Sequence, residues 1–112
     1  MTHATTISIK HEPFVLLPQR EYEELLARAA GETLPPLPPA NARGHRPARE
    51  AVRVVIARNI ITSRIKAGWT QQELARRAKV SVETISRLES AKHKPQAATL
   101  QRIDAAFNKA GV

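Results

Sequence analysis

Residues 70–90 constrain the fold more strongly than any other part of the chain. Thr70, followed three residues later by Glu73, forms a capping box, a pattern that satisfies unpaired backbone N–H groups where a helix begins. Three apolar residues then repeat at helical spacing, namely Leu74, Ala75 and Ala78. The segment therefore predicts a short helix with one apolar face.

A second short helix is predicted after a tight joint at residues 79–81. Ser81 is a favourable N-cap because its side-chain oxygen can accept a hydrogen bond from the first turn. Ile85 and Leu88 would lie on the buried face of this helix. Two such short helices are marginal alone, so the pair requires flanking helices to pack against.

Both flanks of this pair contain a helical pattern. The longer candidate covers residues 50–67, and its apolar residues are Val52, Val55, Ile56, Ile60, Ile61 and Ile65. The other covers residues 99–110, with a core face made of Leu100, Ile103 and Phe107 and a stop at Gly111. Trp69, at the junction between helices, favours packing into the core over stacking on a ligand.

From about residue 54 to residue 110, the chain resembles the helix-turn-helix domain of the XRE/phage-repressor family. The matching residues are Arg64, Gly68, Thr70, Gln71, Leu74, Ala75, Val80, Ser81, Ile85, Ser86, Leu88, Glu89, Pro95, Thr99, Leu100 and Ile103. Lys79 and Ala91 depart from the pattern, since the family commonly has Gly there. A left-handed backbone at residue 79 would cost a non-Gly residue about 1 kcal/mol. The resemblance implies a helical DNA-binding domain in which Arg64 pairs with Glu89.

The second helix of a helix-turn-helix enters the major groove and presents its N-terminal residues to base edges. The exposed candidates for DNA contact on this helix are Val82, Glu83, Thr84 and Arg87. Arg87 can donate two hydrogen bonds to a guanine, and Glu83 can accept one from a cytosine amine. Alternatively, these two residues form an i, i+4 ion pair. Ser86 is expected to face the helix junction.

Phosphate contacts are expected from three further side chains. By the same resemblance Gln71, at the start of the first helix, would hold one phosphate. Lys92 and Lys94 lie in the basic loop that follows the second helix. These contacts would position the domain on DNA, whereas the base contacts would select the sequence.

Charge is distributed unevenly along the chain. Residues 1–34 contain three basic and five acidic side chains, a formal charge of −2, whereas residues 35–112 contain fifteen basic and five acidic ones, a charge of +10. A basic segment that carries a helical motif is typical of nucleic-acid binding, although charged faces also serve solubility. Together with the motif, the charge favours double-stranded DNA as the partner.

The N-terminal third predicts a β-hairpin followed by a helix, after a loose tail at residues 1–4. Residues 5–10 and 14–17 have strand character, with a turn expected at residues 11–13. A helix would begin with Pro18 and stop near Gly31, with an apolar stripe made of Tyr22, Leu25, Leu26 and Ala29. A lone hairpin is marginal in water, so we expect this segment to dimerise or to become ordered on a partner.

The run FVLLPQREYEELLARA has a resemblance of its own. It is similar to the strand-to-helix piece of bacterial antitoxins of the prevent-host-death type. The same piece occurs ahead of XRE domains in antitoxins whose toxins belong to the RelE/ParE superfamily. This resemblance implies contacts to a RelE/ParE-like toxin, or to a second copy in a homodimer, through Phe14, Tyr22, Leu25 and Leu26. The alternative is that these side chains only pack on the hairpin.

Five of the eight prolines lie within residues 32–49. Proline fixes φ and lacks a backbone donor, so this stretch predicts a partly stiff linker. The predicted division of the chain is an N-terminal module at residues 1–34, a linker at 35–49 and a helix-turn-helix domain at 50–112. A Pro-rich ligand for an SH3-like domain is the less favoured interpretation of the linker. Three arginines near its end could reach DNA: Arg43, Arg46 and Arg49.

Enzymatic and metal-dependent functions are not expected. The chain has no Cys, and its four His residues lack metal-ligand spacing. No catalytic set, cofactor motif, signal peptide or membrane-length apolar run is found, so a soluble cytoplasmic protein is expected. The fold class predicted is mostly α, a phage-repressor-like helical domain preceded by a hairpin and helix.

Two functional hypotheses follow, and a structural adaptor without DNA binding is a third, less favoured one. The first is the antitoxin of a type II toxin–antitoxin pair, which neutralises its toxin and represses its own operon. The second is a stand-alone XRE-family transcriptional regulator, in which the N-terminal module serves only for dimerisation.

Overall fold

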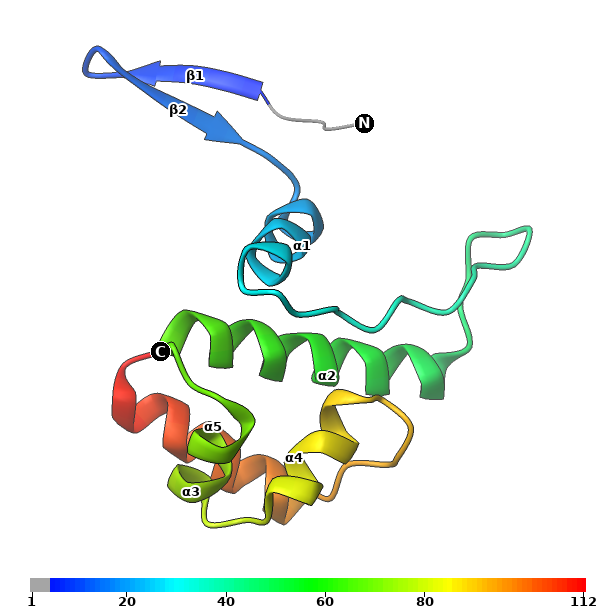
Figure 1. Ribbon diagram of the computed structural model, residues 1–112. Helices are drawn as coiled ribbons and strands as arrows, with labels where there is room; N and C mark the ends of the chain where they lie inside the picture. The colour runs from blue at the N-terminus through cyan, green and yellow to red at the C-terminus, as the bar shows by residue number, and fades with distance from the viewer. Residues whose placement is uncertain (1–4) are drawn as a thin grey trace. The chain divides into compact units, whose positions relative to one another are not determined.

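The computed structural model describes residues 5–112, so the expected N-terminal tail lies outside the described residues. The chain divides into two compact units, with the boundary between residues 33 and 34 (Figure 1). We call residues 5–33 the hairpin–helix unit and residues 34–112 the helical unit. Five helices and one antiparallel hairpin make up the described elements. The predicted class, mostly α with an N-terminal hairpin and helix, is confirmed.

The hairpin pairs strand β1, Thr5–Ile9, with strand β2, Glu12–Leu16. The prediction of a turn at residues 11–13 is wrong. Lys10 and His11 form the turn, with φ values of 53° and 67°. Two successive positive φ values are typical of a two-residue hairpin turn, whose twist matches that of the strands. Pro13 instead lies in β2 opposite Ser8. A proline is tolerated there because each strand of a two-stranded sheet is an edge.

The register gives the hairpin one apolar face. Side chains alternate along each strand, and Ile7 pairs with Phe14. One face therefore combines the apolar residues Ile7, Ile9, Phe14 and Leu16, whereas the opposite face carries Thr6, Ser8, Pro13 and Val15. Helix α1, Gln19–Ala29, follows directly after Pro18. The chain leaves this helix through Gly31, which has a φ of 72°.

Residues 34–47 of the helical unit contain no helix or strand. Their start is tied to helix α2, Ala48–Ala67, because Arg58 Nη1 donates a hydrogen bond of 3.1 Å to the Pro35 carbonyl. A turn follows, in which the Asn41 side chain accepts hydrogen bonds from the backbone of residues 43 and 45. The proline-rich segment is thus partly folded onto α2. From the sequence, this segment was predicted to be only a linker.

Three shorter helices complete the helical unit: α3, Gln71–Ala78, α4, Val82–Glu89, and α5, Ala97–Ala110. Helix α3 packs against α4 and α5, and α2 packs against α4. Leu74, Ile85 and Ile103, one from each of the three helices, are the largest fully buried side chains. This arrangement confirms the predicted core faces of α3, α4 and α5.

The predicted core face of α2 is partly wrong. Val52 and Val55 are 57% and 46% exposed, although the sequence pattern assigned them to the apolar surface. Val54 and Ala57 are buried instead, whereas Ile60 and Ile61 are buried as predicted. The helix is apolar on several sides near its start, so spacing alone did not identify the buried one.

Trp69 packs against the core as predicted. Its ring stacks on Phe107, with centroids 5.5 Å apart and an interplanar angle of 9°. The Arg77 guanidinium lies 4.4 Å from the Trp69 ring centroid, a cation–π contact. The indole is therefore held between the core and a charged side chain.

The ends of α3 and α4 follow the sequence signals, with one exception. Thr70 and Ser81 cap the two helices by accepting hydrogen bonds of 3.1 Å from the backbone N–H groups of Glu73 and Thr84. Only this half of the predicted capping box forms within residues 5–112, because the Glu73 carboxylate binds Arg76 and Arg77 instead.

The two residues that replace common glycines both have a left-handed backbone. Lys79 ends α3 with a φ of 59°, and Ala91 follows α4 with a φ of 61°. The left-handed conformation brings Cβ close to a carbonyl oxygen, which costs roughly 1–2 kcal/mol. Both positions therefore retain local strain.

We expect Lys79→Gly and Ala91→Gly each to raise the free energy of unfolding by about 1 kcal/mol, because glycine relieves this strain. Urea denaturation followed by circular dichroism measures the change. The control is Ala105→Gly in the middle of α5, which should lower stability by about 1 kcal/mol. Equal losses at all three positions would contradict the strain argument.

Candidate nucleic-acid interface

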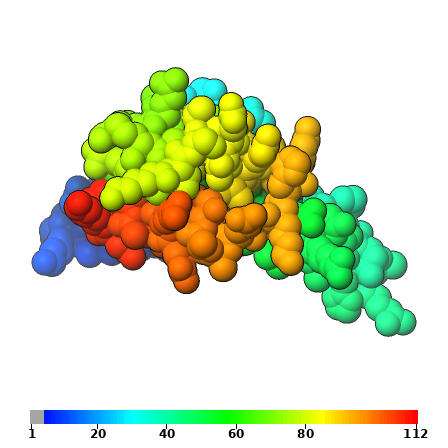
Figure 2. Space-filling model, turned by 90° about the horizontal axis from the view of Figure 1, so that it is seen from below, coloured from blue at the N-terminus to red at the C-terminus, as the bar shows by residue number. Residues whose placement is uncertain are grey.

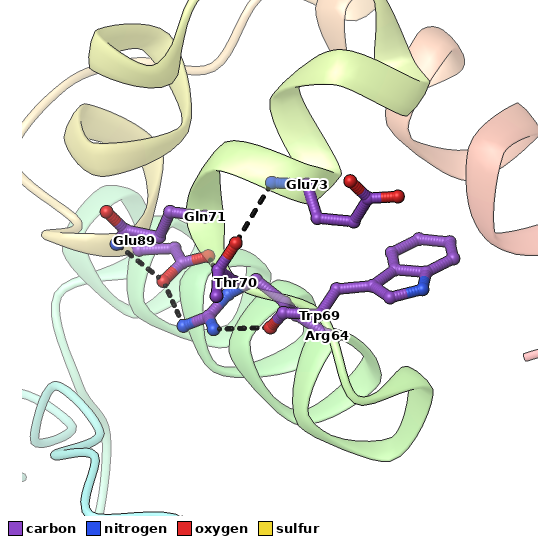
Figure 3. Close-up of polar contacts among 6 residues, drawn as sticks. All are labelled: Arg64, Trp69, Thr70, Gln71, Glu73 and Glu89. Atoms are coloured by element: carbon purple, nitrogen blue, oxygen red, sulfur yellow. Dashed lines mark hydrogen bonds and ion pairs between the residues drawn. The ribbon is translucent and has the colours of Figure 1, made fainter.

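A buried ion pair holds α4 on the other helices of the domain (Figure 3). Arg64 of α2 donates from Nε to Glu89 Oε2 and from Nη2 to Glu89 Oε1, both at 2.8 Å. Its Nη1 donates to the Trp69 carbonyl at 3.0 Å. Arg64 is 3% and Glu89 7% exposed. The predicted pairing of Arg64 with Glu89 is confirmed, and it fixes the C-terminal end of α4 against α2.

Gln71 joins the same network. Its Nε2 donates a hydrogen bond of 3.0 Å to Glu89 Oε1, so the first residue of α3 is linked to the last residue of α4. The sequence predicted a phosphate contact for Gln71. A side-chain amide has two N–H donors, so the bond to Glu89 uses only one of them. The observed contact therefore orients the amide that the phosphate prediction requires.

Four residues form the outer face of α4. The exposed residues on this side are Val82, Glu83, Ser86 and Arg87. They share one side of the helix because Ser86 follows Val82, and Arg87 follows Glu83, by four residues, which is about one turn. Ser86 was expected at the helix junction, which is wrong. Ser86 follows Val82 by four residues, and this spacing could have predicted its place on the outer face. Thr84 is half-buried, and its hydroxyl lies 2.8 Å from the Ser81 Oγ.

The alternative role considered for Glu83 and Arg87, an ion pair within α4, does not form among the described residues. Arg87 instead lines a surface groove of about 360 Å³ between α4 and the start of α5. His93, Lys94 and Gln96 line the same groove. No role was predicted for His93 from the sequence. Arg87 and the loop thus present their cationic groups to one hollow beside the outer face of α4.

Helix α3 carries a second, exposed charge cluster. Hydrogen bonds from the Arg76 and then the Arg77 guanidinium lower the pKa of Glu73 to about 2, from an ordinary value of 4.5. The same pairing raises the pKa of Arg76. The cluster favours the folded state above pH 4.5, and this contribution disappears as the pH falls towards 2. It therefore remains intact at neutral pH.

The residues predicted for toxin or dimer contact lie in the hairpin–helix unit. Phe14, Tyr22 and Leu25 are exposed, and Leu26 is half-buried. Lys92 and Lys94 are exposed in the loop after α4. No group of His, Cys, Asp or Glu side chains within residues 5–112 is arranged to hold a metal ion. In the same part of the chain, no helix is long and apolar enough to cross a membrane.

Comparison with known proteins agrees with this geometry. Residues 60–110 match the family model described as Helix-turn-helix. No curated protein and no solved structure matches the chain. The matched segment begins inside α2 and contains α3, α4 and α5. Residues 60–110 thus form a helix-turn-helix domain, which supports DNA binding and a role in transcription regulation.

We expect Glu89→Ala to lower the free energy of unfolding by about 3–5 kcal/mol, because it leaves the buried Arg64 guanidinium without its carboxylate. Thermal or urea unfolding measures this loss. Glu73→Ala is the matched control, since it removes a carboxylate with two arginine partners at the surface, where pairs contribute little. A loss at residue 89 as small as that at residue 73 would contradict the role of the buried pair.

Proposed function

We propose that the protein represses transcription by binding a specific DNA sequence through the outer face of α4. The observation that carries this proposal is the combination of an exposed polar face with a rigid anchor. Glu83, Ser86 and Arg87 are exposed, while the Arg64–Glu89 pair fixes the same helix from behind. Side chains that read bases must be held in place, because a shift of the helix would misalign every hydrogen bond to the base edges.

The roles on DNA follow from the chemistry of these side chains. Arg87 can donate two hydrogen bonds to a guanine, and Glu83 can accept one from a cytosine amine. Val82, 39% exposed, is suited to contact a thymine methyl group. Lys92, Lys94 and Gln71 supply phosphate contacts that fix the position of the domain on the duplex. Thr84 binds Ser81, so its part is to complete the N-terminal cap.

Replacing Arg87 by Ala should cost about 1–3 kcal/mol at one base pair and remove the preference there, because a bidentate contact to guanine is lost. Selection from random duplexes, with the wild type and the variant in parallel, measures this change. Lys92→Ala is the control, since losing a phosphate contact should weaken binding to all sequences alike. An identical consensus from the wild type and Arg87→Ala would show that Arg87 does not read a base.

We further propose that the protein is an antitoxin that binds a RelE/ParE-like toxin through the hairpin–helix unit. Two features support this. The run from Phe14 to Ala29 is similar to the strand-to-helix piece of bacterial antitoxins of the prevent-host-death type. The unit also exposes large apolar side chains, including Ile9, Phe14, Leu16, Tyr22 and Leu25. Exposed apolar surface of this kind on a small unit is typical of a protein interface.

The two parts of the unit suit two partners. Each strand of the hairpin has an open edge, which can pair with the same edge of a second copy and bury the apolar faces together. A two-fold dimer would also match the symmetry of a repressor operator. Helix α1 carries Glu21, Glu23 and Glu24 beside its apolar stripe, so it is suited to a toxin with a basic surface.

If this division holds, Leu25→Asp should abolish co-purification of the toxin from native cells and leave the dimer intact. Phe14→Asp should dissociate the dimer, as measured by analytical ultracentrifugation, because it puts a charge on the hairpin face that the dimer would bury. The controls are Gln19→Asp at the start of α1 and Ser8→Asp on the opposite hairpin face, which should retain both partners. Retention of toxin and dimer by all four variants would place both interfaces outside this unit.

A further inference from the structure

The first three turns of α2 extend beyond the matched helix-turn-helix segment. The helix begins at Ala48, whereas the family match begins at residue 60. This extension carries Arg49, which was predicted from the sequence as one of three arginines that could reach DNA, and Arg53, for which no role was predicted. It also carries the exposed Val52. The extension therefore adds a charged surface to the matched domain.

These residues line a second surface groove, of about 480 Å³, together with Ala48, Lys94 and Pro95. Three of its six lining residues are cationic and none is acidic. Glu50, the acidic residue in the first turn of α2, does not line it. The remaining lining side chains are the aliphatic Ala48, Val52 and Pro95. The groove thus combines aliphatic and basic side chains in equal number.

The second groove adjoins the DNA-binding face of α4. Lys94 lines both this groove and the groove beside α4 that contains Arg87. Figure 2 shows the loop that carries Lys94, in orange, between α4 in yellow and the first part of α2 in green. A ligand that lies along α4 and reaches Lys94 therefore arrives at Arg49 and Arg53 next.

We propose that this groove binds the sugar–phosphate backbone of DNA that flanks the base pairs read by α4. This inference rests on the proposed DNA binding. Guanidinium groups bind phosphate through paired N–H donors, and the aliphatic lining residues are suited to contact a deoxyribose. An acidic peptide would match the charge as well, but only a duplex seated on α4 also accounts for the shared Lys94. Such contacts lengthen the footprint without adding sequence preference.

The test uses the full chain and two duplexes that contain the consensus selected by the wild type. One duplex ends at the outermost selected base pair, and the other adds about one helical turn of arbitrary sequence on each side. Arg49→Ala and Arg53→Ala are compared with Lys109→Ala, which removes one charge near the far end of α5. About 18 Å of helix separates residue 97 from residue 109.

We expect the wild type to bind the longer duplex more tightly, and Arg49→Ala and Arg53→Ala to lose part of this gain. Each lost phosphate contact reduces the salt slope by about 0.9. The ratio of wild-type to variant affinity should therefore shrink about 3.5-fold between roughly 50 and 200 mM salt. Arg49→Lys should keep most of the slope, and Lys109→Ala should keep all of it. The selected consensus should be the same for every one of these variants.

Salt slopes for Arg49→Ala and Arg53→Ala equal to that of Lys109→Ala would overturn the proposal. If Arg87→Ala still changed the base preference, the proposed function would stand without this groove. Altered self-association with unchanged salt slopes would make the groove a subunit interface and would also overturn the proposal. If the wild type selected no sequence, both proposals would be wrong. Melting temperatures show whether each variant folds, and Arg49, which is exposed, decides the result if Arg53→Ala is destabilised.

Discussion

The buried pair between Arg64 and Glu89 is the interaction on which the arrangement of the helical unit depends. It joins α2 to the end of α4, and through Gln71 and the Trp69 carbonyl it also reaches the start of α3. Buried pairs of this kind are weak evidence for net stability, since apolar residues of similar volume often perform as well. Their directional hydrogen bonds, however, fix one orientation of the helices. The pair therefore explains how a small core can hold α4 at a defined angle to its neighbours.

The parts of the fold that sequence reasoning predicted correctly are those with strong local signals. Thr70 and Ser81 cap their helices because short hydroxyl side chains at a helix start can reach the backbone N–H groups of the first turn. Leu74, Ile85 and Ile103 are buried because each lies on the single apolar face of its helix. The Arg64–Glu89 pair came from a resemblance, since no local pattern connects residues 25 positions apart.

The errors arose where several local solutions have similar energies. The hairpin turn lies at Lys10 and His11 because a two-residue connection matches the strand twist, although neither residue is the Asn or Gly that such a turn prefers. Val52 and Val55 look like core residues in α2, but only the position of the other helices determines which side is buried. The groove beside Pro95 was beyond prediction, because it combines two segments that are at least 41 positions apart in the sequence.

The shortness of α4 has a consequence for the amount of protein in the cell. An isolated helix of eight residues is marginal in water, so the proposed DNA-reading face of α4 exists only while the whole domain is folded. DNA that binds the folded state alone stabilises it, by about 2.7 kcal/mol when the free sites exceed Kd a hundredfold. If the protein binds its operator as proposed, the bound molecules are thereby protected from the proteases that act on unfolded chains. Occupied sites would then retain their protein longest, and the unbound surplus would be degraded first.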